Sequence, residues 1–425
     1  GIGMVHQHFK LVHNFTVAEN IVLGAEPGNG LKLNMKQAVR RVQELSERYG
    51  LAIDPNARTD KITVGMQQRT EILKMLYRDA NILIFDEPTA VLMPQEIEDL
   101  IAIMRSLVAR GKSIILITHK LKEIEQVADR CVITRRGQLV DTVNVADTTT
   151  QEMADKMVGR VVHFNIDKQP QTPGKCVLKV EHLSVKNEQN VLKVNDFSFD
   201  IHAGEIVGIA GLVGAGKSEL CKTIFGAYER TSGSVLLGGR ELKINNPSQA
   251  VKNGIALVPE ERRKEGVLVN ENVTLNLSAA ALSKFCNGSF VSKAKTEKNA
   301  HEYVKGLDIK TPSIKQHVKN LSGGNQQKVA VGKWLAADCD VYIFDEPTKG
   351  VDVGAKQDIF RLINDITLRG NSVIYASCEN AELLSITDRI YVLFDGRVMA
   401  ELETAKTDED EIMHYAVGST TKYAR

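Results

Sequence analysis

The chain has 425 residues, a hydrophobic content of 43% and a formal net charge of +1. This length exceeds what one hydrophobic core supports and predicts about two domains. The near-neutral charge gives no basic face that would favour nucleic acid, so we expect no nucleic-acid partner. The six cysteines include no Cys-x-x-Cys pair, which argues against a metal site built from cysteines and against a disulfide framework. The apolar runs are far shorter than the ~20 residues of a membrane helix.

The chain repeats itself. It opens on GIGMVHQHFK, and a similar phrase, GIALVPEERR, begins at Gly254. FDEPT begins at Phe85 and again at Phe344, 259 residues later, and the same offset relates ITVGMQQR to LSGGNQQK and SIILIT to SVIYAS. A repeat of this length predicts a duplicated domain rather than a solenoid.

Each copy of FDEPT ends a continuous apolar run, ANILIFDEPT or CDVYIFDEPT. Such a run predicts a parallel strand buried on both faces, and carboxylates at its carboxyl end lie where α/β sheets bind ligands. We expect Asp86 and Asp345 to orient a metal ion. We expect Glu87 and Glu346 to accept a proton from an attacking water.

A polar segment with two prolines, FNIDKQPQTPGK, separates the copies. Its composition predicts a short linker at 164–175. The expected domains are therefore residues 1–163 and 176–425.

The second copy carries GLVGAGKS at 211–218, between the apolar strand EIVGIAG and the helical pattern ELCKTIFGA. G-x-x-x-x-G-K-S in that context predicts a phosphate-binding loop, because glycines let backbone N–H groups face phosphate oxygens at a helix start. Its lysine is expected to reach the β- and γ-phosphates, and its serine to ligate Mg²⁺. The predicted contacts are Gly211, Gly214, Ala215, Gly216, Lys217 and Ser218.

No such loop precedes the opening phrase, so we expect the first domain to lack its amino-terminal part, the phosphate loop included.

Between the phosphate loop and the second FDEPT, LSGGNQQ predicts a helix start with Ser322 near its cap. Backbone N–H groups at Gly323 and Gly324 could hold a second anion there.

In this order, GxxxxGKS, LSGGNQQ, FDEPT and the following strand resemble the ATP-binding-cassette (ABC) ATPases. The tandem, with LSGGNQQKVA and DEPTKGVDVGAK, resembles the fused ATPase subunit of bacterial simple-sugar importers of the ribose, galactose or xylose type. The first half, with GIGMVHQHFKLVHNFTVAENIVLG and ILITHKLKEI, is similar to their nucleoside-importing relatives. The resemblance leaves the cargo open between a monosaccharide and a nucleoside.

The resemblance implies an α/β fold. It consists of two P-loop ABC domains in tandem, each a RecA-like, mostly parallel sheet with a helical subdomain. It also implies ATP and Mg²⁺ as cofactors, with each ATP held by one domain's phosphate loop and the other domain's LSGGQ-like signature. For the first site, it assigns Gln7 to the metal ion and water, together with Asp86 and Glu87, and His119 to the γ-phosphate. The signature that serves this site is Ser322, Gly323, Gly324 and Asn325.

The second site departs from the family pattern. Glu260 stands where the family has a glutamine, Cys378 stands where it has a histidine, and Val64 replaces the first glycine of the signature. Losing one donor to a transition-state oxyanion typically costs ~2.7–4 kcal/mol. We therefore predict that the second site binds ATP and hydrolyses it slowly, and that the first site does most of the hydrolysis. We also expect the chain as given to hydrolyse ATP slowly.

The leading hypothesis is an import ATPase at the cytoplasmic face of the bacterial cell membrane. Its partners would be integral membrane permease subunits, contacted through residues 11–61 and 262–320, and a periplasmic or lipid-anchored solute-binding protein. The alternative is a soluble tandem ABC protein that acts on ribosomes, although such proteins usually have a long charged linker and two intact signatures. A P-loop kinase ranks last because it has no use for FDEPT or LSGGN.

Overall fold

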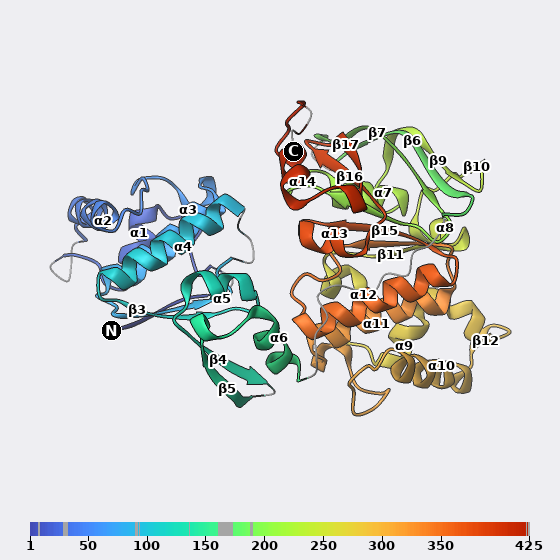
Figure 1. The fold of residues 1–425 in the computed structure, drawn as a ribbon, viewed down its shortest axis with the longest axis horizontal. Coiled ribbons are helices and arrows are strands. Elements are labelled where there is room, and N and C mark those ends of the chain that lie inside the picture. Colours follow the sequence, from blue (N-terminus) through green and yellow to red (C-terminus); the bar gives the residue numbers. More distant parts are fainter. Residues whose placement is uncertain are drawn as a thin grey trace. The chain divides into compact units, whose positions relative to one another are not determined.

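The computed structural model describes residues 1–6, 9–28, 33–89, 92, 94–135, 137–159, 173–187, 190–421 and 423 (Figure 1). The chain divides into two compact units, unit 1 (Gly1–Val162) and unit 2 (His163–Arg425). Most of the predicted linker lies outside the described residues. Within the part that the structure describes, no helix is both long and apolar enough to cross a membrane.

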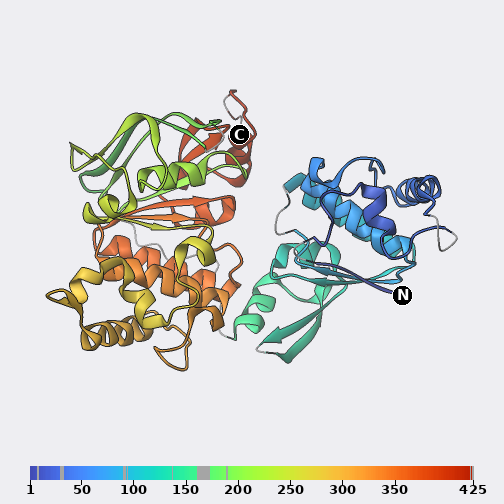
Figure 2. The same cartoon turned by 180° about the vertical axis from the view of Figure 1, so that it is seen from behind.

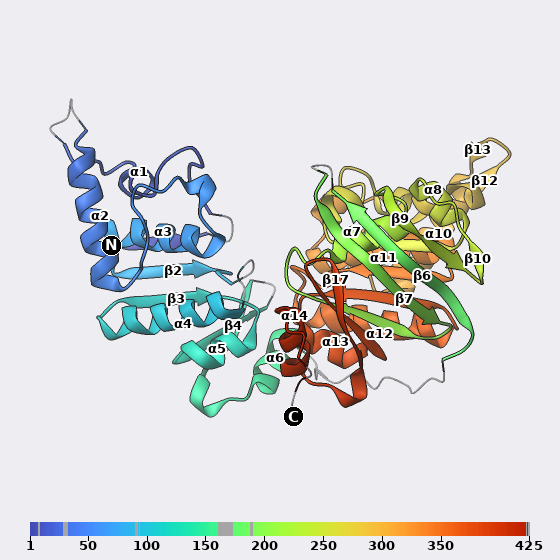
Figure 3. The same ribbon diagram turned by 90° about the horizontal axis from the view of Figure 1, so that it is seen from above.

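Unit 1 is built on a three-stranded parallel sheet of order β1-β2-β3, with a separate antiparallel hairpin, β4-β5. Helix α1 packs on α3, and α3 packs on β1 (Figure 3). The elements of unit 1 are β1 (Ile2–Val5), α1 (Val17–Val22), α2 (Met35–Tyr49), η1 (Thr59–Lys61), α3 (Val64–Tyr77), β2 (Ile82–Asp86), α4 (Pro94–Ala109), β3 (Ser113–Ile117), α5 (Leu121–Val127), β4 (Arg130–Arg135), β5 (Gln138–Asn144), η2 (Val145–Asp147) and α6 (Thr150–Val158).

Unit 2 has a six-stranded sheet of order β11-β14-β15-β8-β16-β17, parallel except for β17, and a four-stranded antiparallel sheet of order β10-β9-β6-β7. Its strands are β6 (Cys176–Lys186), β7 (Leu192–His202), β8 (Ile206–Ala210), β9 (Arg230–Leu237), β10 (Arg240–Glu241), β11 (Ile255–Val258), β12 (Cys286–Asn287), β13 (Phe290–Val291), β14 (Val341–Asp345), β15 (Ser372–Ser377), β16 (Arg389–Phe394) and β17 (Arg397–Glu403).

Helix α7 packs between the two sheets of unit 2, whereas α11 and α12 pack against the other face of the six-stranded sheet (Figure 2). The helices and short turns are α7 (Lys217–Ile224), α8 (Pro247–Lys252), η3 (Arg262–Gly266), α9 (Val273–Ser278), η4 (Ala279–Phe285), α10 (Lys293–Gly306), η5 (Val318–Asn320), α11 (Gly323–Ala337), α12 (Val353–Leu368), α13 (Asn380–Ile386), η6 (Thr404–Lys406) and α14 (Glu409–Ala416). The predicted fold, two α/β units with parallel sheets and helical parts, is confirmed.

The two units repeat each other in detail. β2 pairs with β3 in the register Ile82 to Ser113, and β14 pairs with β15 in the register Val341 to Ser372, each residue 259 positions later. A buried asparagine also recurs: the side chain of Asn20 exchanges hydrogen bonds with the backbone of Val12, and that of Asn276 does so with Leu268. Duplication of the sequence has therefore produced duplicated structure.

The sheets differ at one strand. In unit 2, β8 lies between β15 and β16, and every residue of β15 is buried. Unit 1 has no described strand between β3 and β4, so β3 forms the edge of its sheet. As a result, Ile115 and Ile117 of β3 are 51% and 47% exposed.

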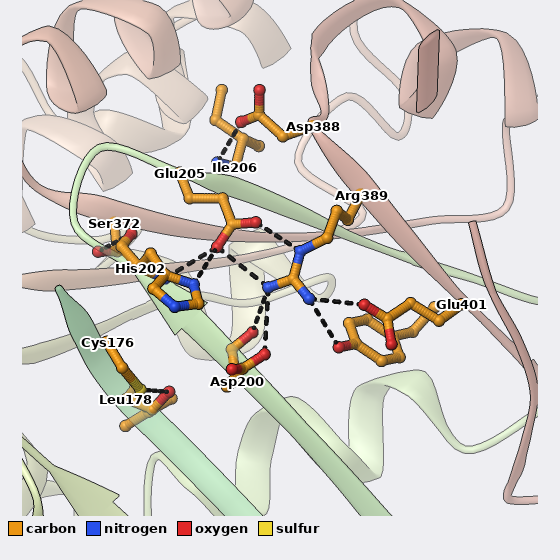
Figure 4. A network of polar contacts seen from close by, with 11 residues as sticks. Cys176, Leu178, Asp200, His202, Glu205, Ile206, Ser372, Asp388, Arg389 and Glu401 are labelled. Atoms are coloured by element: carbon orange, nitrogen blue, oxygen red, sulfur yellow. Dashed lines mark hydrogen bonds and ion pairs between the residues drawn. The ribbon is translucent and has the colours of Figure 1, made fainter. Parts of the chain in front are cut away.

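A polar network ties the two sheets of unit 2 together (Figure 4). Arg389, the first residue of β16, donates from Nε to Glu205 Oε1 over 2.6 Å and from Nη1 to Glu401 Oε1 over 2.6 Å. Its Nη2 lies 3.2 Å from Asp200 Oδ1 on β7. Glu205 is only 2% exposed, so this ion pair is largely removed from water.

Candidate functional site

The loop between β8 and α7 has the backbone shape that its glycines allow. Gly211, Gly214 and Gly216 have φ values of +151°, +85° and +102°, which side chains strongly disfavour. A Cβ atom at Gly216 would lie 2.3 Å from the carbonyl oxygen of Lys193. Ala215, between the last two glycines, is buried. The sequence therefore fixes a tight loop whose backbone can approach a phosphate group closely.

Lys217 lies at the start of α7 and is only 5% exposed. Its Nζ donates to the carbonyl oxygens of Gly211 and Leu212 over 2.7 and 3.1 Å, and lies 3.1 Å from Cys378 Sγ and 3.7 Å from Glu346 Oε1. Burial raises the pKa of Cys378 to about 12, so the thiol is neutral. The lysine is thus held at the phosphate loop before any ligand arrives.

Ser218 and Asp345 form an oxygen-rich corner beside this lysine. Ser218 Oγ donates to Asp345 Oδ1 over 3.0 Å and lies 3.3 Å from Glu260 Oε2. Asp345 is fully buried, and its Oδ2 has no hydrogen-bond partner among the described residues. Burial raises the pKa of Asp345 to about 7. A buried carboxylate oxygen without a partner is costly unless a cation or donor meets it.

These residues fit a hard cation such as Mg²⁺, which prefers carboxylate and hydroxyl oxygens. Within the described ranges, no group of three or more Asp, Glu, His or Cys side chains forms a metal site by itself. The oxygens of Ser218 and Asp345 therefore suit an ion that takes its remaining ligands from phosphate and water, as Mg²⁺ usually does.

Glu260 makes a second contact that the sequence did not suggest. Its Oε1 accepts a hydrogen bond from Lys349 Nζ over 2.6 Å. Burial raises the pKa of Glu260, but the hydrogen bond and charge of Lys349 outweigh it, so that the pKa lies below its usual value. The signal was present in the repeat: the second FDEPT is followed by Lys349 and the first by Ala90.

Glu87 and Glu346 follow their strands in the same unusual conformation, with φ values of +44° and +46°. Glu87 N donates to Ile117 O over 2.8 Å, and Glu346 N donates to Ala376 O over 2.9 Å. A non-glycine residue in this region is strained and persists where its surroundings fix it. Both glutamates are thus fixed at the carboxyl ends of parallel strands.

In unit 1, Glu87 Oε1 lies 2.9 Å from His119 Nδ1, with both side chains about one-quarter exposed at 27% and 24%. Asp86 precedes this glutamate at the end of β2. Gln7, which the resemblance assigns to the metal ion, lies outside the described residues. The structure therefore brings together the predicted proton acceptor and the predicted switch histidine.

The signature begins α11, as predicted, with Ser322 as its N-cap. The Ser322 hydroxyl accepts a hydrogen bond from Asn325 Nδ2 over 2.8 Å instead of capping the helix. Gly323 and Gly324 are closely packed: added Cβ atoms would lie 3.0 Å from Gly350 O and 2.5 Å from Ala355 Cβ. Within unit 2, these residues form no described hydrogen bond with the phosphate loop.

The corresponding helix of unit 1, α3, begins at Val64 after the N-cap Thr63. Val64 occupies the position of Gly323, 259 residues earlier, and is 38% exposed. Its side chain projects where the second signature has only a hydrogen atom.

A buried glutamate in each unit was missed by the sequence analysis. Glu123 accepts hydrogen bonds from Thr89 and Thr118, the residues that follow the acidic pair and precede His119. Glu382 accepts from the matching Thr348 and Ser377. Each glutamate thus connects the carboxyl ends of two neighbouring strands, β2 and β3 in unit 1 and β14 and β15 in unit 2. The repeat in HKLKE and CENAE, at the same offset, was the available signal.

The comparisons agree with this geometry. A family model described as ABC transporter matches residues 1–90 and 194–349. The nucleoside import ATP-binding protein NupA of Lactococcus lactis subsp. cremoris is 42% identical over 98% of this chain and 83% of its own length. The guanosine import ATP-binding protein NupO of Bacillus subtilis is 43% identical over 100% and 84%. The ribose import ATP-binding protein RbsA of Clostridium tetani is 39% identical over 98% and 82%.

A crystal structure of a nucleotide-free ATP-binding cassette from an ABC transporter shares the fold, with a TM-score of 0.50 at 20% identity. It is matched over its whole length by 58% of this chain. Together, the phosphate loop, the acidic strand ends and the signature helix define an ATP-binding, ATP-hydrolysing protein. The chain belongs to the ABC transporter family.

Proposed function

We propose that this chain is the ATPase subunit of an importer that takes up a nucleoside or a monosaccharide through a membrane permease. The observation that carries this proposal is its identity of 39–43% over nearly the whole chain with import ATP-binding proteins for nucleosides, guanosine and ribose. The names of these relatives favour an importer over the soluble, ribosome-acting alternative. We place the chain as a peripheral subunit at the cytoplasmic face of the cell membrane.

In unit 2, we assign phosphate binding to the loop 211–218, because its glycine backbone can approach a phosphate closely and its buried lysine is hydrogen-bonded to the same loop. Ser218 and Asp345 would hold Mg²⁺, which when bound neutralises phosphate charge. Glu346 is positioned by its strained backbone to take a proton from water at this edge of the sheet. In unit 1, the metal candidates are Asp86, which matches Asp345, and Gln7, which matches Glu260.

The two sites are proposed to be unequal. Glu87 has an imidazole partner that can position it and can donate a hydrogen bond to a phosphate oxygen. Cys378, in the matching position, is a half-buried neutral thiol and a weak donor. We therefore assign most hydrolysis to Glu87 and His119 of unit 1. In the signature of unit 2, we assign phosphate contacts to Ser322, Gly323, Gly324 and Asn325.

The proposed permease contact is a groove of about 920 Å³ on unit 2. Helix α7 begins at the phosphate loop and ends at this groove, where Lys222 Nζ lies 2.9 Å from Glu265 Oε1. A partner seated there would touch the same helix that binds phosphate, which links docking to the nucleotide. The groove is lined by residues that include Lys222, Tyr228, Glu265, Ser283, Lys333 and Trp334.

Co-purification tests the proposal. The chain, expressed at natural levels with an affinity tag, should bring down an integral membrane permease, and cells lacking it should lose uptake of labelled guanosine or of labelled ribose. Ser283→Trp, which fills the groove, should reduce permease recovery about tenfold or more, whereas Ser289→Trp, at an exposed serine outside the groove, should not. Recovery of ribosomes with no membrane protein would refute the importer.

A further inference from the structure

Glu260 and Lys349 form an ion pair at the rim of the phosphate pocket in unit 2. Lys349 Nζ lies 2.6 Å from Glu260 Oε1, and the other oxygen of this carboxylate lies 3.3 Å from Ser218 Oγ. Lys349 is anchored nearby, because its backbone N–H donates to Glu346 O over 3.2 Å. The lysine therefore neutralises a carboxylate that touches the proposed metal-binding serine.

The first domain carries neither of these charges. The position that matches Glu260 in the opening phrase is Gln7, and the position that matches Lys349 after FDEPT is Ala90. Both of these residues lie outside the described part of unit 1, so this comparison rests on sequence alone. Relative to the first domain, the second has one additional carboxylate and one additional ammonium group at these positions, and their charges cancel.

The pocket beside the pair has oxygen atoms that can hold a cation. Asp345 is fully buried, and its Oδ2 has no hydrogen-bond partner among the described residues. Ser218 bridges this aspartate and Glu260, at 3.0 and 3.3 Å. An ion bound to Ser218 at about 2.1 Å would thus also be within reach of the Glu260 carboxylate.

The Lys349 side chain can move away from Glu260 into solvent, since it is 52% exposed at the rim. An ammonium group and a divalent ion on one carboxylate repel each other. The carboxylate that Lys349 neutralises is therefore less available to a metal ion.

We propose that Lys349 is a tethered counter-cation that competes with the divalent metal ion for Glu260 and so weakens metal binding in unit 2. This inference rests on the ATP and Mg²⁺ site proposed above. It gives the second site a metal affinity set by an internal ion pair that the first domain does not encode.

Binding of Mn²⁺ alone to the whole chain, without nucleotide, tests the proposal, with free Mn²⁺ followed by its electron paramagnetic resonance signal. Asp345→Asn identifies the signal of this site. Lys349→Ala and Glu260→Gln each install the residue of the first domain, and the double variant installs both. Lys264→Ala is the matched control, because Lys264 is an exposed lysine that pairs with Glu261 over 3.3 Å in the same segment.

We expect Lys349→Ala to bind Mn²⁺ about tenfold more tightly and Glu260→Gln about tenfold more weakly than the wild type. In the Glu260→Gln background, Lys349→Ala should change the affinity for Mn²⁺ less than about twofold, because the carboxylate for which the lysine and the metal ion compete has been removed. Lys264→Ala should bind as the wild type does. Lys349→Gln repeats the test in a variant that keeps the length of the side chain.

Unchanged or weaker Mn²⁺ binding by Lys349→Ala and Lys349→Gln would overturn the proposal, as would equal tightening with and without Glu260. Binding of a fluorescent ATP analogue in the presence of EDTA separates this result from the proposed function. A chain that binds ATP but shows no effect of Lys349 contradicts only the counter-cation. A chain with the predicted Mn²⁺ pattern but no ATP binding contradicts only the ATP site.

Discussion

In unit 1, Oε1 of Glu87 lies 2.9 Å from Nδ1 of His119, a pairing of carboxylate and imidazole that unit 2 lacks at the matching positions. The matching residues there are Glu346 and Cys378, and the cysteine instead lies 3.1 Å from Nζ of Lys217. Two copies of one fold thus present different chemistry at the same strand ends.

Restoring the histidine should activate unit 2. Cys378→His supplies a ring nitrogen next to Glu346, and we expect ATP turnover by the chain to rise about tenfold, since a positioned donor at a developing charge is worth that much or more. Steady-state phosphate release measures the rate. Cys378→Ser is the control: it changes the same atom without adding an imidazole, and a comparable rise in this variant would contradict the role of the ring.

The glutamates should contribute unequally. In a version of the chain that carries a phosphate loop ahead of residue 1, Glu87→Gln should lower ATP turnover about 100-fold, because the variant amide accepts no proton from water. Glu346→Gln should remove only the minor part of the rate. The reverse order would show that unit 2 is the principal site.

Much of this site could be predicted from sequence because its signals are local. The strand before Asp345, the glycines before Lys217 and the N-cap at Ser322 each lie within a few residues of the side chain they position. The contact between Glu260 and Lys349 joins residues 89 apart, and that between Glu205 and Arg389 joins residues 184 apart. Such pairs depend on tertiary packing, which no local pattern encodes.

The edge position of β3 was also not predictable from its own residues. SIILI is at least as apolar as SVIYA, yet Ile115 and Ile117 are about half exposed, at 51% and 47%, while the whole of β15 is buried. The difference comes from a neighbour, β8, which pairs with both β15 and β16. An apolar run therefore predicts a strand but does not show which strands flank it.

ATP binding should depend on Lys217 and not on the next lysine of the same helix. Lys217→Ala should weaken binding of a fluorescent ATP analogue about 100-fold, because it removes charged hydrogen bonds to phosphate from a buried group. Lys222→Ala, on α7 but paired with Glu265 at the groove, should bind the analogue as the wild type does while losing permease in the co-purification assay. Equal losses of ATP binding in both variants would indicate general damage to α7.

Arg389 should stabilise unit 2 through its buried partner. Its Nε donates to Glu205, which is 2% exposed, and this hydrogen bond to the carboxylate raises the pKa of the guanidinium above its usual value. Arg389→Ala removes the arginine partner of the buried Glu205, which then keeps, among the described residues, only its contacts with the backbone N–H and the imidazole of His202. The substitution should lower the free energy of unfolding by about 3 kcal/mol.

The chain offers both a probe and a control for this measurement. Trp334 is the single tryptophan of the sequence and lies in unit 2, so its fluorescence during urea unfolding reports that unit and not unit 1. Arg130 is the counterpart of Arg389, 259 residues earlier, and is exposed. Arg130→Ala should therefore leave the tryptophan transition within about 0.5 kcal/mol of the wild type, and an equally small shift for Arg389→Ala would show that the network in Figure 4 adds little to stability.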